Sequence, residues 1–270
     1  DNLQMCKIQT HLYALRKIKN EFKDYYIKHA KQDLDSTGTF ERIYILARER
    51  IGQENADYYK AIELENVLPS EIEKRSFEII TEELTQSGIV LDPEKAPVIK
   101  RCIHTSADFD YAQNLVFSEN AIARAKEAIR NGASIVTDTQ MGRSGINKKR
   151  LAQYGGQVYC FMSDEDVAEK AKRDGTTRAV ASMEKACELD EKLIFAIGNA
   201  PTALIHLYEL IRAGKIRPEL VIGVPVGFVN VIQSKELILE LPDTPYIVAR
   251  GRKGGSNIAA CICNALLYNL

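Results

Sequence analysis

Short apolar segments alternate with amphipathic ones through the second half of the chain. Five segments are apolar at consecutive positions and are predicted to be strands; they cover residues 133–137, 157–161, 193–197, 220–224 and 246–249. Strands that are apolar on both faces are typical of a parallel sheet covered by helices on both sides. The pattern predicts an α/β fold with an open, mostly parallel sheet of about five strands flanked by helices.

Apolar residues at helical spacing separate these strands. The predicted helices of this half cover residues 148–153, 167–189, 201–213, 234–239 and 256–267. Upstream, Ser70 and Glu73 have the spacing of a capping box that begins a helix. Pro93 suits the first position of the next helix, and an amphipathic helix is predicted from Asn120 to Asn131.

Residues 1–60 differ from the rest of the chain. They are rich in Lys, Tyr, Glu and Asp, and the apolar residues from Leu12 to Phe22 follow helical spacing. We expect an N-terminal helical extension with a packing or dimerisation role. The main α/β domain is predicted to cover residues 61–270.

Composition excludes several classes of protein. The formal net charge of −1 gives no global attraction to nucleic acid or to an anionic membrane. No apolar run approaches the ~20 residues of a membrane helix. The six cysteines are scattered and form no CxxC pair, which is typical of a reducing compartment and predicts a cytoplasmic protein.

Three predicted strands lead into turns that contain glycine and then into helices. The turns lie within residues 197–204, 223–229 and 249–256. The carboxyl ends of parallel strands meet at one edge of a sheet, where ligands bind. Glycine lets the backbone approach a ligand, and helix N-termini attract anions. We therefore expect one surface suited to a large anionic molecule, with charge supplied by Arg252 and Lys253.

His104 is the histidine with the strongest chemical context. Arg101 precedes it by three residues, so both side chains share one face of a predicted helix. A guanidinium can hold a carboxylate, and an imidazole can transfer a proton near neutral pH. A histidine that caps its helix is the alternative. Asp138 directly follows a predicted strand, where it could be a catalytic acid or could stabilise the turn. Arg178 lies in a predicted helix, where it could be a functional residue or a solvated surface cation.

Other site classes have little support. No His, Cys, Asp and Glu cluster shows metal-ligand spacing, although His104, Asp108 and Asp110 could be assembled into one. The GxSxG motif of a hydrolase is absent. The run 251–256 has neither Walker nor GxGxxG spacing.

Several motifs, in order, resemble the precorrin-8X methylmutase family of cobalamin biosynthesis. They occupy residues 75–80, 101–104, 133–138, 197–204, 223–229, 234–235 and 249–256. The resemblance extends from about residue 62 to the end of the chain, and residues 1–60 fall outside the usual family pattern.

The resemblance implies an isomerase that needs no cofactor. The family moves a methyl group from C11 to C12 of a corrinoid ring, on a metal-free or a cobalt-containing substrate that carries many carboxylate arms. It also implies an open parallel α/β fold and a homodimer with its sites near the interface.

The family's functional residues can be placed on this sequence. Its catalytic histidine falls on His104, a substrate-contacting serine on Ser76 and an arginine on Arg101. A further pocket arginine falls on Arg178, in its own or the partner's site. With the turn residues, the candidate site has His104 as catalytic residue and six substrate-binding residues: Ser76, Arg101, Arg178, Asn199, Arg252 and Lys253.

Our hypothesis is that His104 acts as a general acid toward the macrocycle. A non-catalytic corrinoid carrier or chaperone is the alternative, because the same pocket would serve it. A third hypothesis is a nucleotide-dependent α/β enzyme that uses the loop containing Gly254 and Gly255.

Overall fold

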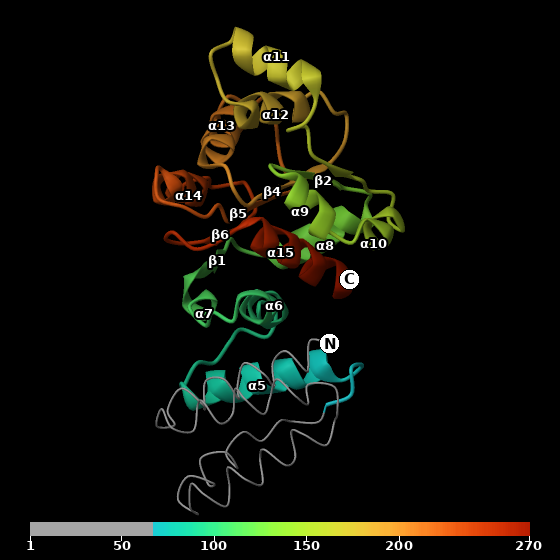
Figure 1. The fold of residues 1–270 in the computed structure, drawn as a ribbon, viewed down its shortest axis with the longest axis vertical. Helices are drawn as coiled ribbons and strands as arrows, with labels where there is room; N and C mark the ends of the chain where they lie inside the picture. The colour runs from blue at the N-terminus through green and yellow to red at the C-terminus, as the bar shows by residue number, and fades with distance from the viewer. Residues whose placement is uncertain (1–66) are drawn as a thin grey trace, which may run out of the picture. The chain divides into compact units, whose positions relative to one another are not determined.

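A six-stranded sheet lies between two layers of helices in the computed structural model, which describes residues 67–270 (Figure 1). The strand order is β1-β6-β5-β4-β2-β3. Their bounds are β1 Leu115–Phe117, β2 Ser134–Thr137, β3 Val158–Tyr159, β4 Leu193–Ile197, β5 Leu220–Gly223 and β6 Tyr246–Ala249. The neighbours from β3 to β6 all pair in parallel, which confirms the predicted sheet.

The sequence prediction missed β1, the antiparallel edge strand. It has three residues and pairs with β6, with Leu115 opposite Ala249. It follows α7 (Tyr111–Asn114), a helix of only four residues. Two elements this short contain too few residues to show a periodic pattern.

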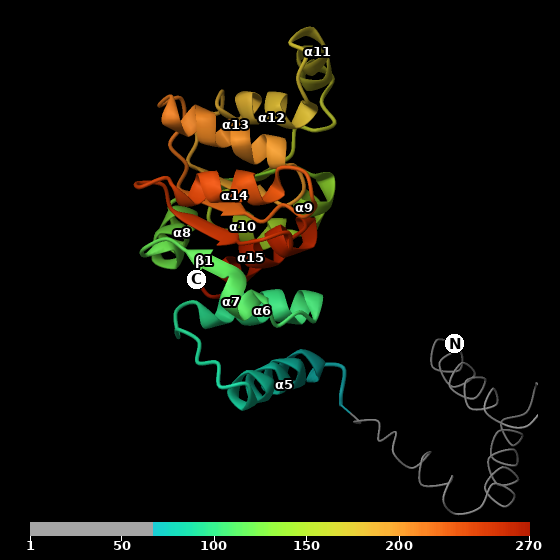
Figure 2. The same ribbon diagram turned by 90° about the vertical axis from the view of Figure 1, so that its left-hand side faces the viewer.

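The helices divide into two layers, seen edge-on in Figure 2. The first layer comprises α5 (Ile72–Gln86), α6 (Ala96–Ser106), α8 (Ala121–Arg130), α9 (Gln140–Gly145), α10 (Lys148–Ala152) and α15 (Ser256–Tyr268). The second comprises α11 (Glu165–Arg173), α12 (Arg178–Ala186), α13 (Pro201–Arg212) and α14 (Val231–Leu239).

Each central strand contributes side chains to both layers. In β4, Ile194 and Ala196 join the core of the first layer, whereas Phe195 and Ile197 join the core of the second. All four side chains are buried. The continuous apolar run in the sequence thus reflects helices on both faces of a parallel sheet.

Two helix starts differ from the prediction. Ser70 does not cap α5, which begins at Ile72 after Glu71 without a side-chain cap. The next helix, α6, begins at Ala96 rather than at Pro93. Asp92 instead forms a tight turn in which its carboxylate accepts the backbone N–H of Glu94 at 2.9 Å, because Asp side chains hydrogen-bond the backbone two residues on.

The single helix predicted over residues 167–189 is also wrong. The chain breaks between α11 and α12, where Gly175 adopts a positive φ of 64°. The Thr177 hydroxyl then accepts the backbone N–H of Val180 and caps α12. Arg178 is consequently the first residue of a new helix rather than an interior one. The α14 helix begins three residues before its predicted start at Ser234.

Residues 67–270 form one compact unit. The helical extension predicted for residues 1–60 lies outside the described residues, so its boundary at residue 61 stays a prediction. Within the described part, no helix is long and apolar enough to cross a membrane.

The three glycine-containing turns meet through direct backbone packing. A Cβ on Gly198 would lie 2.7 Å from the carbonyl oxygen of Gly255 and from the Cα of Ser256. A Cβ on Gly254 would lie 2.0 Å from the carbonyl oxygen of Val224. The N–H of Gly255 donates to that same oxygen at 2.9 Å. The turn after β6 therefore lies against the ends of β4 and β5. This packing agrees with the prediction that the three turns form one surface.

This packing predicts that Gly198→Ala lowers the free energy of unfolding by about 3 kcal/mol or more, because the opposing backbone cannot move aside. Urea unfolding measures it. Gly214→Ala is the control: Gly214 has open space around it but a φ of 69°, so only conformational strain of about 1–2 kcal/mol is expected. Equal losses in the two variants would contradict the close approach.

Candidate functional site

The candidate catalytic pair lies where α5 packs on α6. The His104 ring stacks on Phe77 of α5, with ring centroids 5.2 Å apart and an interplanar angle of 22°. The Arg101 guanidinium lies 4.8 Å from the centroid of the same ring. Arg101 Nη1 is also 2.5 Å from the Glu73 carboxylate. One aromatic ring of α5 thus supports both predicted side chains of α6.

His104 is exposed and available to a ligand. Within residues 67–270, no hydrogen bond engages either of its ring nitrogens. The end of α6 is closed by backbone atoms instead: Ala107 has a φ of 54°, and its N–H donates to the Ile103 carbonyl at 2.7 Å. His104 lies in the last turn of α6 but makes no hydrogen bond to its terminal carbonyls within residues 67–270, so the structure gives no support to a side-chain cap by His104.

Ser76 lies beside this pair on α5. It falls between Glu73 and Phe77 on the part of the helix that faces α6. Its hydroxyl donates to the carbonyl of Ile72 at 2.8 Å. The oxygen lone pairs of Ser76 stay able to accept a hydrogen bond.

The β6–α15 turn carries two cations with different surroundings. Lys253 Nζ lies 2.6 Å from the Asp108 carboxylate and also contacts Asp110. These contacts raise the pKa of Lys253 and lower the pKa of Asp108. Both aspartates lie in the segment that joins α6 to α7, so the pairing ties the turn to the end of the His104 helix. A direct substrate contact by Lys253 stays a prediction.

Arg252 and Phe228 form a second cation–aromatic pair. The Arg252 guanidinium lies 5.3 Å from the Phe228 ring, and Phe228 is 80% exposed. Arg252 forms no ion pair within residues 67–270, and a cation beside an exposed aromatic ring suits a ligand that is both apolar and anionic. Phe228 was not among the site residues predicted from the sequence, although a large apolar residue inside a turn that contains glycine was the available signal.

Asp138 supports the turn that contains Asn199. Its buried carboxylate accepts three backbone N–H groups, from Gly198 at 2.9 Å, Asn199 at 2.8 Å and Ala200 at 2.6 Å. Burial raises the pKa of the Asp138 carboxyl, and the three N–H donors oppose that rise. Of the two roles considered for Asp138, turn formation is the one that the structure supports. The side chain of Asn199 stays exposed just before α13.

Arg178 lies apart from His104 in the same chain. Arg178 begins α12 in the second helical layer, whereas His104 belongs to α6 in the first, on the opposite face of the sheet (Figures 1 and 2). The Arg178 side chain is exposed, and it forms no ion pair within residues 67–270. The structure brings Ser76, Arg101 and His104 together where α5 packs on α6, and it ties Lys253 to the segment that follows α6. Arg252 lies on the same turn as Lys253, and Asn199 lies on the β4–α13 turn, whose Gly198 packs on the β6–α15 turn. Arg178 lies apart from all of these.

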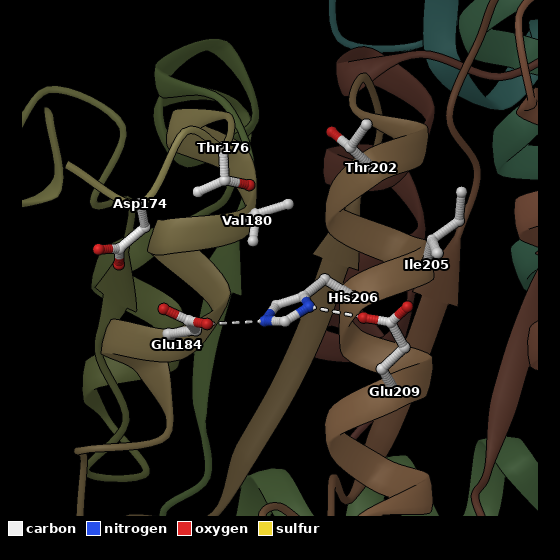
Figure 3. Close-up of a pocket in the computed structure, with 8 residues that line it drawn as sticks. All are labelled: Asp174, Thr176, Val180, Glu184, Thr202, Ile205, His206 and Glu209. Atoms are coloured by element: carbon white, nitrogen blue, oxygen red, sulfur yellow. Dashed lines mark hydrogen bonds and ion pairs between the residues drawn. The ribbon is translucent and has the colours of Figure 1, made fainter. Parts of the chain in front are cut away.

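A groove of about 400 Å³ lies between α12 and α13 (Figure 3). It contains His206, whose ring nitrogens lie 2.8 Å from Glu209 and 3.1 Å from Glu184. No predicted site residue lines this groove. Its acidic lining, which also includes Asp174, would repel a polycarboxylate. The groove is therefore not part of the candidate site.

Metal binding gains no support from the arrangement. In the described part of the chain, no group of three His, Cys, Asp or Glu side chains is placed to hold a metal ion. Asp108 and Asp110, considered above with His104, both pair with Lys253 instead.

Lys235 stabilises the backbone of the β6–α15 turn. Its side chain is fully buried, and Nζ donates to the carbonyls of Gly251 and Lys253, each at 2.8 Å. Burial lowers the pKa of this ammonium to about 8. Both carbonyls flank Arg252, so Lys235 fixes the backbone that presents the arginine.

The lowered pKa predicts a pH-dependent stability. Between pH about 8 and the ordinary value of 10.5, the folded protein releases a proton from Lys235 that the unfolded chain retains. Stability rises with pH wherever the unfolded state binds more protons. Relative to Lys235→Met, the free energy of unfolding of the parent should therefore rise over this window, by on the order of 3 kcal/mol. Urea unfolding of both proteins across pH 7–11 measures the difference; a difference independent of pH would contradict the lowered pKa.

Comparisons with known proteins agree on one family. The CbiC family model, described as precorrin-8X methylmutase, matches residues 71–269. A cobalt-precorrin-8 methylmutase of Priestia megaterium is 46% identical over 200 residues, which cover 74% of this chain and 88% of that protein. A precorrin-8X methylmutase of Pseudomonas aeruginosa is 39% identical over 196 residues, covering 72% and 93%. A crystal structure of precorrin-8X methylmutase from Thermus thermophilus superposes with a TM-score of 0.66 at 38% identity, covering 73% of this chain and 96% of that one.

Proposed function

The chain belongs to the precorrin-8X methylmutase family, and we propose that its methylmutase activity depends on His104 as the proton donor to a corrinoid. As a methylmutase, the protein is an isomerase of cobalamin biosynthesis. The reaction moves a methyl group from C11 to C12 of the macrocycle. The observation that carries the role of His104 is an exposed imidazole with unengaged nitrogens, one helical turn from Arg101 and stacked on Phe77.

The proposed chemistry is an intramolecular rearrangement. His104 donates a proton to the conjugated ring, the bond from C11 to the methyl carbon breaks, and the bond from C12 to that carbon forms. The proton then returns to His104, so no atom is gained or lost. General acid catalysis of this kind contributes about 10²–10⁴-fold. Phe77 keeps the imidazole plane in a fixed orientation, which limits the orientations that the proton donor must sample.

The substrate's carboxylate arms define the rest of the site. We assign them to Arg101 beside His104 and to Arg252 on the β6–α15 turn, with Ser76 and Asn199 as polar contacts. Phe228 offers an apolar face beside Arg252. Lys253 contributes mainly by holding the turn against the end of α6, because two carboxylates already surround its ammonium.

A homodimer explains the position of Arg178. This residue lies on the face of the sheet opposite to His104, so a shared site requires Arg178 from a second subunit. We propose that each site combines His104 of one subunit with Arg178 of its partner, in a cytoplasmic homodimer.

The cobalt-containing substrate is the proposed natural one. The Priestia megaterium relative, at 46% identity, is named a cobalt-precorrin-8 methylmutase, whereas the Pseudomonas aeruginosa relative, at 39%, is named a precorrin-8X methylmutase. An absorbance assay with paired substrates, with and without cobalt, tests the assignment. Faster turnover of cobalt-precorrin-8 to cobyrinate supports it, and faster conversion of precorrin-8X to hydrogenobyrinate contradicts it.

Replacing His104 should separate chemistry from binding. His104→Ala is expected to lower kcat by about 10²–10⁴-fold, the contribution of a lost general acid. Its affinity for cobyrinate should stay within a few-fold, because the carboxylate contacts persist. His206→Ala is the matched control, since His206 lies in the groove between α12 and α13. The assays are stopped-flow absorbance and corrinoid titration.

Turnover of His104→Ala within a few-fold of the parent would remove His104 from the chemistry. A parent protein that binds corrinoid but converts neither substrate would favour the carrier or chaperone reading.

Mixing two inactive variants tests the shared site. If sites form across the interface, a heterodimer of His104→Ala and Arg178→Ala contains one site with both native residues. Random subunit exchange between equal amounts should restore about a quarter of parental activity, because half of the dimers are mixed and each has one intact site. Each variant assayed alone should not recover this activity, because its dimers contain no site with both native residues. If Arg178 serves its own subunit, the mixture stays inactive.

A further inference from the structure

We infer that Glu73 is a built-in competitor for the substrate carboxylate that binds Arg101. The Glu73 carboxylate contacts the Arg101 guanidinium at the position that we assign to a carboxylate arm, so that substrate binding displaces it. This inference rests on the proposed function, because it assigns one arm of the corrinoid to Arg101.

The surroundings of Arg101 limit how a carboxylate can approach it. Its guanidinium lies 4.8 Å from the ring centroid of Phe77 and 5.9 Å from that of Tyr268, so aromatic rings flank it. Its side chain is only 22% exposed, and its one ion pair within residues 67–270 is with Glu73 at 2.5 Å. An incoming carboxylate that pairs with this guanidinium therefore meets Glu73 first.

The Glu73 carboxylate can separate from Arg101 at a small cost in free energy. Its side chain is 57% exposed, and one of its oxygens contacts the guanidinium. Solvent-exposed ion pairs of this kind are weak, because water solvates the separated charges well. Glu73 can therefore turn into solvent while its helix stays in place.

Lys253 shows the contrasting arrangement. Two carboxylates from the segment after α6 surround its ammonium, and one of them, Asp108, is only 27% exposed. Displacing both at once is harder than displacing one exposed glutamate. The two acidic contacts thus differ in role: Asp108 and Asp110 hold a loop, whereas Glu73 occupies a binding position.

The expected consequence is that only a charged arm displaces Glu73 from Arg101. A carboxylate arm replaces Glu73 with an equivalent ion pair, whereas an amidated arm cannot, because a neutral amide loses the charge-assisted bond to Arg101. Glu73 therefore lowers the affinity for a corrinoid that carries a carboxylate at this arm, whereas a corrinoid amidated there leaves the Glu73–Arg101 pair in place.

Titration with cobyrinate tests the inference. Glu73→Gln should bind cobyrinate about two- to fivefold more tightly than the parent, the range expected when a weak exposed pair no longer competes. Glu78→Gln is the matched control: it removes the same charge from α5, but Glu78 pairs with Lys74 and Arg75. If the loss of one negative charge alone strengthens binding of the polyanionic corrinoid, Glu78→Gln will show the same gain of affinity as Glu73→Gln.

A double-mutant cycle adds the second test. In an Arg101→Gln background, Glu73→Gln should no longer change the affinity, because there is no guanidinium to compete for. If Glu73→Gln binds no more tightly than Glu78→Gln, or if its gain persists without Arg101, the inference is overturned, and Glu73 only holds α5 on α6. Turnover by the parent protein tests the proposed function separately.

Discussion

The site depends on backbone-to-backbone contact at the carboxyl ends of β4 and β5. Gly198 and Gly254 have no side chain because the neighbouring turn occupies the space where a Cβ would lie. The Asp138 carboxylate fixes the first turn by accepting three N–H groups. Lys235 fixes the third by donating to two carbonyls. These contacts use buried or backbone groups, so the exposed side chains of Asn199 and Arg252 are not needed to hold the turns.

The β6–α15 turn also connects the sheet to α6, the helix that carries His104. Lys253 pairs with Asp108 and Asp110, which follow α6 closely, while α15 packs along α6 itself. In the seam between these helices the buried thiols of Cys102 and Cys261 lie 3.7 Å apart. His104 is thus held relative to Arg252 by a continuous set of contacts. This fixed spacing fits the roles proposed for His104 as proton donor and for Arg252 as a carboxylate-binding residue, because a large, flat substrate must meet both in one orientation.

The sequence predicted the parallel strands and the meeting of the three turns, because consecutive apolar residues and strand-end glycines are local signals. It did not predict β1, whose three residues gain stability only by pairing with β6. It predicted a single helix where Gly175 and Thr177 create a break, since apolar spacing continues across the gap. The sequence also did not predict which charged residues form ion pairs with one another. Nothing local indicates that Glu73 would reach Arg101, or that Asp108 and Asp110 would surround Lys253, because those contacts exist only after packing.

The most direct test of this account is a crystal structure of the protein with cobyrinate bound. The account predicts a carboxylate arm on the Arg101 guanidinium, with Glu73 turned into solvent. It also predicts a ring nitrogen of His104 within hydrogen-bonding distance of the macrocycle or of a water molecule bound to it. Cobyrinate bound elsewhere, with Glu73 still paired to Arg101 and His104 facing only solvent, would contradict it.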